Sequence, residues 1–135
     1  MAGGINPNTA KFTQNEESNP RTIERIDTNK LMSKAVVHGG MVYLSGLTAS
    51  DSSQDVQGQC RQILESIDKY LAEAGTDKSK LLSAQIWLTD IGTWADMNEV
   101  WVGWIDAANP PARATVEAKL AVPALSIEIM VTAAL

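Results

Sequence analysis

The spacing of apolar residues switches between two periods along this chain, and that switch is the strongest constraint on its fold. From residue 55 to residue 74 the apolar side chains recur at the period of an α-helix: Val56, Cys60, Ile63, Leu64, Ile67, Leu71 and Ala74. Ser52 or Ser53 can cap the start of this helix, and Gly75 stands where helices commonly end. The stretch predicts an amphipathic helix whose apolar stripe faces a core.

A second helix is predicted from about residue 93 to residue 107. Its apolar face carries Trp94, Met97, Trp101, Trp104 and Ile105. Thr93 and Asp96 resemble a capping box at its start, and Asn109-Pro110-Pro111 stops it.

Around both helices the period falls to two, which is typical of strands. Strands are predicted near residues 22–26, 35–38, 41–44, 82–88, 114–120 and 125–133, and the second and third are joined by a hairpin at Gly39-Gly40. This order predicts an α+β domain, a mixed six-stranded β-sheet with two helices packed on one face. The other face, which carries Trp87 and Met130, then needs a cover, and self-association is the simplest one.

The length and the N-terminal sequence define the domain. A chain of 135 residues is typical of a single domain. Residues 1–20 are polar and follow neither period, which predicts a flexible N-terminal tail followed by one domain over residues 21–135. The N-terminus lacks the features of a signal peptide, and no stretch holds the roughly 18 apolar residues of a membrane span. We therefore expect a cytoplasmic protein with no membrane partner.

Charge and residue types exclude several classes of function. The net charge of −5 argues against nucleic acid as a main partner, because that binding depends on basic residues. His38 is the only histidine and Cys60, on the apolar stripe, the only cysteine, so neither a zinc site nor a disulfide is expected. A Ser-His-Asp triad would need His38 beside the hairpin turn, and no glycine-rich phosphate loop is present. We expect no metal and no cofactor.

Two charged residues remain as candidates for chemistry. Pro110 and Pro111 stiffen a loop that brings Arg113 to the first residue of a strand, where its guanidinium can hold a carboxylate by two parallel hydrogen bonds. A surface salt bridge is the alternative role for Arg113. Glu128 lies in an otherwise apolar strand, on the same face as Met130. If a subunit interface covers that face, its carboxylate is partly desolvated and can transfer protons; if solvent covers it, Glu128 is an ordinary surface residue.

Three motifs occur in a familiar order: Gly40-Met41-Val42-Tyr43-Leu44-Ser45-Gly46, then Pro111-Ala112-Arg113-Ala114-Thr115-Val116-Glu117, then Ile127-Glu128-Ile129. Together they resemble the Rid family, also called the YjgF-like or RidA-like family, over roughly residues 21–135. Asn98 falls where that family has an asparagine before a helix.

The resemblance implies a chorismate-mutase-like fold and a homotrimer with clefts between its subunits. It also implies hydrolysis of reactive enamine/imine intermediates, such as 2-aminoacrylate, to a 2-oxo acid and ammonia. Arg113 would hold the substrate carboxylate, and Glu128 would position or deprotonate the attacking water. Ser45, Gly46, Asn98 and residue 32 would line the substrate-binding pocket.

Two positions depart from the pattern of archetypal Rid proteins. Met32 stands where they carry a tyrosine, and Leu47 stands where they carry a glutamine. These differences indicate a divergent subgroup whose substrate can differ from 2-aminoacrylate. A non-catalytic trimer that binds a small carboxylate metabolite through Arg113 is the main alternative. A ribonuclease fits the negative charge poorly, and a purely structural trimer leaves Arg113 without a role.

Overall fold

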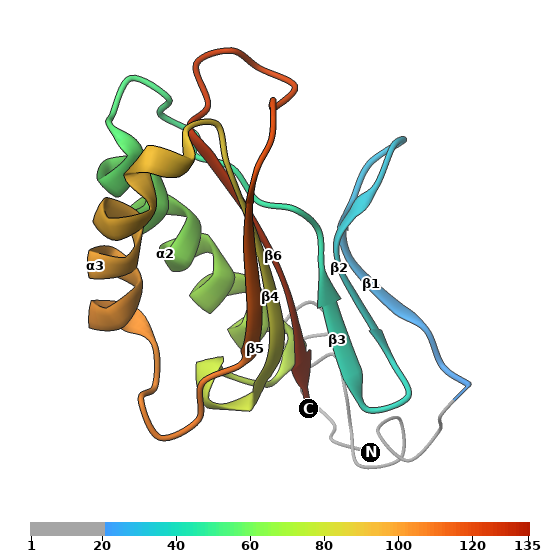
Figure 1. The fold of residues 1–135 in the computed structure, drawn as a ribbon. Coiled ribbons are helices and arrows are strands. Elements are labelled where there is room, and N and C mark those ends of the chain that lie inside the picture. Colours follow the sequence, from blue (N-terminus) through green and yellow to red (C-terminus); the bar gives the residue numbers. More distant parts are fainter. Residues whose placement is uncertain (1–20) are drawn as a thin grey trace.

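The computed structural model describes residues 21–135, which form a six-stranded sheet with two α-helices on one of its faces (Figure 1). The strands are β1 (Glu24–Thr28), β2 (Ser33–His38), β3 (Met41–Leu44), β4 (Leu81–Leu88), β5 (Ala112–Glu117) and β6 (Ile127–Ala134). The helices are α2 (Val56–Ala74) and α3 (Trp94–Trp104), and short 3-10 turns η1 (Lys78–Lys80) and η2 (Ile91–Thr93) precede β4 and α3. The predicted tail, residues 1–20, lies outside the described residues.

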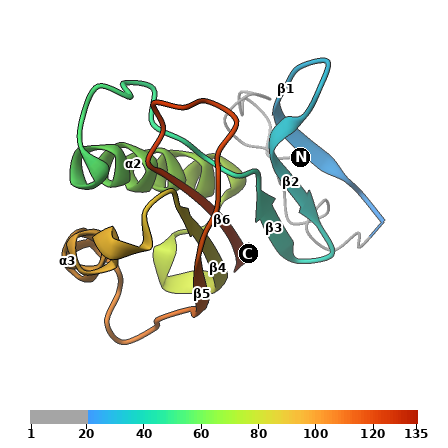
Figure 2. The same cartoon turned by 45° about the horizontal axis from the view of Figure 1, so that its top comes forward.

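The topology explains why both helices cover the same face. The strand order is β1-β2-β3-β6-β4-β5, with β6 antiparallel to both β3 and β4, and with β5 parallel to β4. The chain therefore crosses twice between parallel strands, from β3 through α2 to β4 and from β4 through α3 to β5. Such crossovers share one hand, so two successive ones in the same direction place their helices side by side (Figure 2). The predicted α+β architecture is confirmed.

The cap of α2 differs from the prediction at one end. Asp55, rather than Ser52 or Ser53, is the N-cap, and its carboxylate accepts a hydrogen bond of 2.8 Å from the backbone N–H of Gly58. Ser53 instead donates its hydroxyl to Asp51, at 2.6 Å. Gly75 ends the helix as predicted, with a φ of 93° that favours glycine.

The second helix is shorter than predicted. The capping box does not form, because the Thr93 hydroxyl donates to the Asp90 carbonyl at 2.6 Å and Thr93 belongs to η2. The helix ends at Trp104 and not near residue 107, because a turn closed by Asp106 and Asn109 follows it. Both differences arise from short local turns that compete with the helix.

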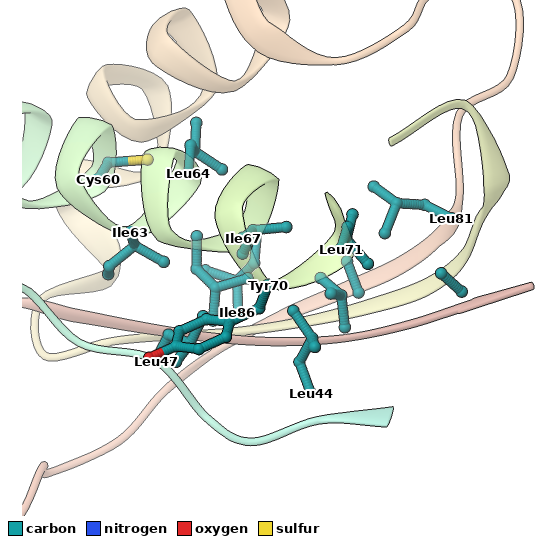
Figure 3. Close-up of a cluster of buried hydrophobic side chains, with 14 of the residues drawn as sticks. Leu44, Leu47, Cys60, Ile63, Leu64, Ile67, Tyr70, Leu71, Leu81 and Ile86 are labelled. Atoms are coloured by element: carbon teal, nitrogen blue, oxygen red, sulfur yellow. The ribbon is translucent and has the colours of Figure 1, made fainter. Parts of the chain in front are cut away.

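The core lies between α2 and the sheet (Figure 3). The predicted apolar stripe of α2 is buried throughout, and Cys60, Ile63, Ile67 and Leu71 have no exposed surface. Burial raises the pKa of the Cys60 thiol to about 11, so this cysteine stays protonated at neutral pH. The prediction that Cys60 packs in the core is confirmed.

The strands differ from the predicted pattern in two places. β5 covers residues 112–117 rather than 114–120, and its apolar residues Ala114 and Val116 are the exposed ones. The other departure is at the start of β4. A register shift between Leu81 and Ser83 turns Leu82 outward, with 44% of its surface exposed. The alternating apolar series that begins at Leu82 in the sequence therefore faces the core only from Ala84 onward. A bulge of this kind reverses the direction of one side chain, and the spacing of apolar residues does not reveal it.

The sheet face opposite the helices carries Tyr43, Trp87, Val116, Glu128 and Met130, and we call it the open face. Tyr43, Val116 and Met130 expose between 40% and 44% of their surface. Within residues 21–135 no other element covers this face, as the sequence led us to expect.

Candidate functional site

Arg113 lies on the helix-covered face of the sheet, at its β5 edge. It is the second residue of β5, not the first, and is level with Ala84 of β4. Its guanidinium carbon is 5.4 Å from the centre of the Trp101 ring in α3, close enough for a cation–π interaction. Partial burial lowers the pKa of Arg113, but a guanidinium still remains charged at neutral pH. No carboxylate among residues 21–135 forms an ion pair with it, so its hydrogen-bonding fork is open to a ligand.

Thr115 belongs to the same half of the site, and the sequence analysis did not single it out. It lies two residues after Arg113 and therefore on the same face of β5. Its hydroxyl is buried and has no hydrogen-bond partner within the part of the chain that the structure describes. Such an unpaired polar group is rare and marks a place where a ligand or a second chain can supply the partner. The spacing of two from Arg113 was the available signal.

Asn98 lies inside α3, in its second turn, rather than before a helix. It precedes Trp101 by three residues, so the two side chains adjoin on the helix surface. The Arg113 guanidinium lies over the ring of the same Trp101. The structure thus brings Asn98 and Arg113 to the same outer edge of the molecule.

Glu128 lies on the open face, level with Trp87 of β4. Its carboxylate packs against the backbone of Gly46, where an added Cβ atom would overlap it. Two backbone hydrogen bonds between Leu47 and Ile129, of 2.8 and 3.1 Å, fix this contact. Within residues 21–135 the carboxylate has neither a hydrogen bond nor an ion pair.

Ser45 belongs to this second half of the site, and Met32 lies in the turn that leads into the strand paired with it. The Ser45 hydroxyl is buried and has no partner among the described residues, as was found for Thr115. The Ser45 N–H donates to the Lys34 carbonyl at 2.9 Å, which extends the pairing of β2 and β3 by one residue. Met32 lies in the β1–β2 turn, two residues before Lys34, and exposes 40% of its surface. The side chain of Asn29 holds that turn by accepting hydrogen bonds from the N–H groups of Leu31 and Met32.

The predicted catalytic pair is divided between two faces of the sheet. Arg113 is level with Ala84, whereas Glu128 is level with Trp87, three residues further along β4. Side chains alternate between faces, so an odd separation puts Arg113 and Glu128 on opposite sides. The burial of Ala84 under the helices and the contact of Arg113 with α3 agree with this. One chain therefore presents two half-sites: Arg113, Thr115 and Asn98 on one side, and Ser45, Gly46 and Glu128 on the other.

Gln59 positions the second half-site from within the core, and sequence reasoning missed it. It is a polar residue with only 1% of its surface exposed. Its amide nitrogen lies 2.9 to 3.2 Å from the carbonyl oxygens of Ser52, Gln54 and Ala124, and its amide oxygen accepts from the Ser126 N–H at 2.8 Å. These bonds join the start of α2 to the loop that leads into β6, two residues before Glu128.

Two concavities lie away from both half-sites. One of about 480 Å³ runs between α2 and α3, lined by Arg61, Asp68 and Trp104 among others. Another, of about 570 Å³, lies near the start of both helices. Within residues 21–135 no three His, Cys, Asp or Glu side chains gather into a group that could hold a metal ion. No helix of this region is long and apolar enough to cross a membrane.

The fold and the two polar half-sites define a class of small α+β proteins with a mixed sheet, an uncovered sheet face and two helices. A family model described as endoribonuclease L-PSP matches residues 22–135, and the chain belongs to this family, known also as the YjgF or Rid family. A RutC family protein from Haemophilus ducreyi is 40% identical over 113 residues, which are 84% of this chain and 97% of that protein. The RutC family protein YoaB from Escherichia coli is 36% identical, over 84% of this chain and 98% of that protein.

Solved structures agree with the fold. The chain superposes with a TM-score of 0.82 on a member of the YjgF protein family from Neisseria meningitidis, which is 39% identical and matched over 86% of this chain and 97% of that one. A protein of the conserved Rid family from Yersinia pestis has a TM-score of 0.78 at 28% identity, over 84% of this chain and 100% of that one. The predicted family and fold class are confirmed.

Proposed function

We propose that the protein is a homotrimeric hydrolase that converts 2-imino acids, and the enamines in equilibrium with them, to 2-oxo acids and ammonia. The observation that carries the proposal is the division of Arg113 and Glu128 between opposite faces of one sheet. Both charged groups lack an ion-pair partner within residues 21–135. An edge of one copy that packs onto the open face of the next would bring the Arg113 of the first to the Glu128 of the second.

The exposed side chains support such an assembly. The open face carries Tyr43, Val116 and Met130, and apolar side chains that gather on one face mark interaction sites. The buried hydroxyls of Ser45 and Thr115 lie one in each half-site, and both lack a partner among the described residues. A small polar ligand between two copies would give each of them one. Three copies related by rotation close a ring in which every half-site is used.

The reaction follows from what each group can do. The Arg113 fork holds the substrate carboxylate by two charge-assisted hydrogen bonds and so fixes the neighbouring imine carbon. Glu128 accepts a proton from a water molecule as the water oxygen forms a bond to that carbon. In the carbinolamine that results from attack on the protonated imine, the proton then passes from Glu128 to the amino nitrogen. The carbon–nitrogen bond breaks as the new hydroxyl gives its remaining proton to Glu128, and the 2-oxo acid and ammonia leave. The imine carbon is itself electrophilic, so no covalent nucleophile is needed.

Two single variants test the roles of the pair. We expect Arg113→Ala to raise KM strongly and to lower kcat/KM by about 100-fold, because the carboxylate loses a charge-assisted pair. Glu128→Gln should lower kcat by about 100-fold while carboxylate binding survives, since an amide cannot accept the proton. A coupled assay in which a pyridoxal-phosphate dehydratase generates the imine, with release of the 2-oxo acid followed over time, measures both.

Mixing the two inactive variants tests the shared site directly. In trimers assembled at random from equal amounts of R113A and E128Q chains, about a quarter of the sites combine an intact Arg113 with an intact Glu128. We therefore expect co-expressed, co-purified mixtures to recover about a quarter of the wild-type activity. Recovery should be absent when the two purified variants are assayed together before their subunits exchange. A co-assembled mixture as inactive as its parents would contradict the shared site.

A carboxylate-binding protein without turnover is the second reading that these experiments decide. Such a protein needs Arg113 to bind the carboxylate, but Glu128 has no chemical role in it. That function would be established if the wild-type protein bound 2-oxo acids through Arg113 but did not accelerate the hydrolysis of any imine.

A further inference from the structure

Lys34 lies at the border of the half-site that holds Glu128. In β2 it alternates with Ala35 and Val37, whose side chains are buried under the helices, so Lys34 points to the open face. The hydrogen bond of 2.9 Å from the Ser45 N–H to the Lys34 carbonyl sets the two residues directly opposite each other on adjacent strands. Side chains in such a pair start about 5 Å apart on the same face.

The Lys34 ammonium has no partner of its own. The residue is half-buried, yet no carboxylate of residues 21–135, Glu128 included, forms an ion pair with it. Burying part of a lysine side chain without a counter-charge costs free energy, which an incoming anion can recover. Lys34 is therefore a second cation, after Arg113, that is open to a ligand.

The charges of the composite site indicate which ligand fits. Arg113 of one copy and Lys34 of the next contribute two positive charges, and Glu128 contributes one negative charge. The form of a 2-imino acid that water attacks is the protonated iminium, which together with its carboxylate is neutral overall. Such a substrate leaves the site with one positive charge in excess. A second carboxylate on the substrate side chain removes that excess.

We propose that Lys34 makes the site selective for 2-imino acids whose side chain carries a second carboxylate. Arg113 holds the carboxylate next to the imine, and Lys34 holds the distal one from the opposite wall. The inference rests on the composite site of the proposed function and adds the substrate class to it. Enzymes that oxidise or eliminate at the amino-bearing carbon of acidic amino acids form such imines.

The kinetic test compares two imines that differ only in charge. Flavin-dependent amino-acid oxidases release the imines of aspartate and of asparagine, and semicarbazide traps whatever imine the protein leaves unhydrolysed. We expect kcat/KM to favour the aspartate imine by on the order of tenfold in the wild-type protein, the usual worth of a hydrogen bond to a charged group. In Lys34→Met that ratio should fall to about one. Lys80→Met, which removes the same charge from an exposed turn, should keep the wild-type ratio.

A binding test separates this inference from the hydrolase itself. Calorimetry of 2-oxoglutarate against 2-oxopentanoate, with wild-type, K34M and K80M protein, measures the preference for a dicarboxylate without any turnover. If no imine is hydrolysed, the hydrolase proposal fails, and a dicarboxylate preference that K34M alone removes still supports the role of Lys34. If the wild-type protein hydrolyses the two imines equally well, or binds the two oxo acids equally well, the proposed selectivity of Lys34 is wrong.

Discussion

The Glu128 carboxylate can lie where it does because residue 46 is a glycine, which has no Cβ methyl group. A Cβ atom at residue 46 would overlap the Glu128 carboxylate, and its nearest neighbours all belong to that side chain. The end of a glutamate side chain is flexible and can move aside at little cost, so the fold should tolerate the change. The carboxylate, however, would leave the position from which it reaches water.

We therefore predict that Gly46→Ala separates activity from stability. The free energy of unfolding should change by less than about 0.5 kcal/mol, while kcat falls by on the order of 100-fold because the proton acceptor is displaced. Urea denaturation and the coupled imine assay measure the two quantities. Gly103→Ala is the matched control, because no atom lies within 4 Å of the added Cβ on the exposed side of α3. It should stabilise the helix by about 0.5 to 1 kcal/mol and leave activity unchanged. A Gly46→Ala protein with wild-type kcat would exclude this role for the contact.

The residues of the two half-sites could be predicted to different degrees. Glu128 stands out because a charge interrupts an apolar strand, Arg113 because a loop stiffened by two prolines leads to it, and the family motifs add Ser45 and Gly46. For Thr115 the only signal was its spacing of two from Arg113, since its importance comes from a hydroxyl that only the packed fold leaves unpaired. Lys34 looks like an ordinary solvated lysine until its pairing with Ser45 is known.

At the scale of elements, Gln59 connects a helix start to a strand start. A glutamine beside the apolar stripe of an amphipathic helix is expected to face solvent. Its partners Ser52, Gln54 and Ala124 belong to loops that carry no periodic signal. The burial of Gln59 was therefore invisible in the sequence, although α2 itself and the order of all elements were predicted.

We predict that Gln59→Met destabilises the fold by about 2 to 3 kcal/mol. Methionine fills a similar volume, but the Ser126 N–H and the Ala124 carbonyl lose their partner in a partly buried place. Chemical denaturation followed by circular dichroism measures the change. Gln57→Met is the control, because Gln57 makes a single exposed bond of 3.0 Å, to the Asp96 carbonyl. It should cost less than about 1 kcal/mol. Equal effects of the two substitutions would contradict the structural role of Gln59.

At the scale of the whole molecule, the open face is the surface that we propose to join the chains. Its apolar side chains remain 40% to 44% exposed at Tyr43, Val116 and Met130. The sequence predicted the need for a cover from the helix count alone, because two helices shield only one face of six strands. It could not indicate that Arg113 and Glu128 lie on opposite faces, since that depends on the register between β4, β5 and β6.

We predict that Met130→Glu converts the assembly to single chains. A carboxylate at the centre of the open face would be buried without a partner in any interface that covers it, and this outweighs the local contacts. Light scattering coupled to size-exclusion chromatography measures the mass, and the imine assay should show activity lost together with the trimer. Val102→Glu, on a side chain of α3 that is 70% exposed, should keep both. A trimeric M130E protein would place the interface elsewhere.

The separation of Arg113 and Glu128 also affects when the protein can act. In the trimer that we propose, Arg113 and Glu128 of one chain serve different sites, so a newly synthesised chain would be inert until it met other copies. Activity would then rise more steeply than the protein concentration wherever that concentration is low. Upon dilution, activity would be lost before any chain unfolds.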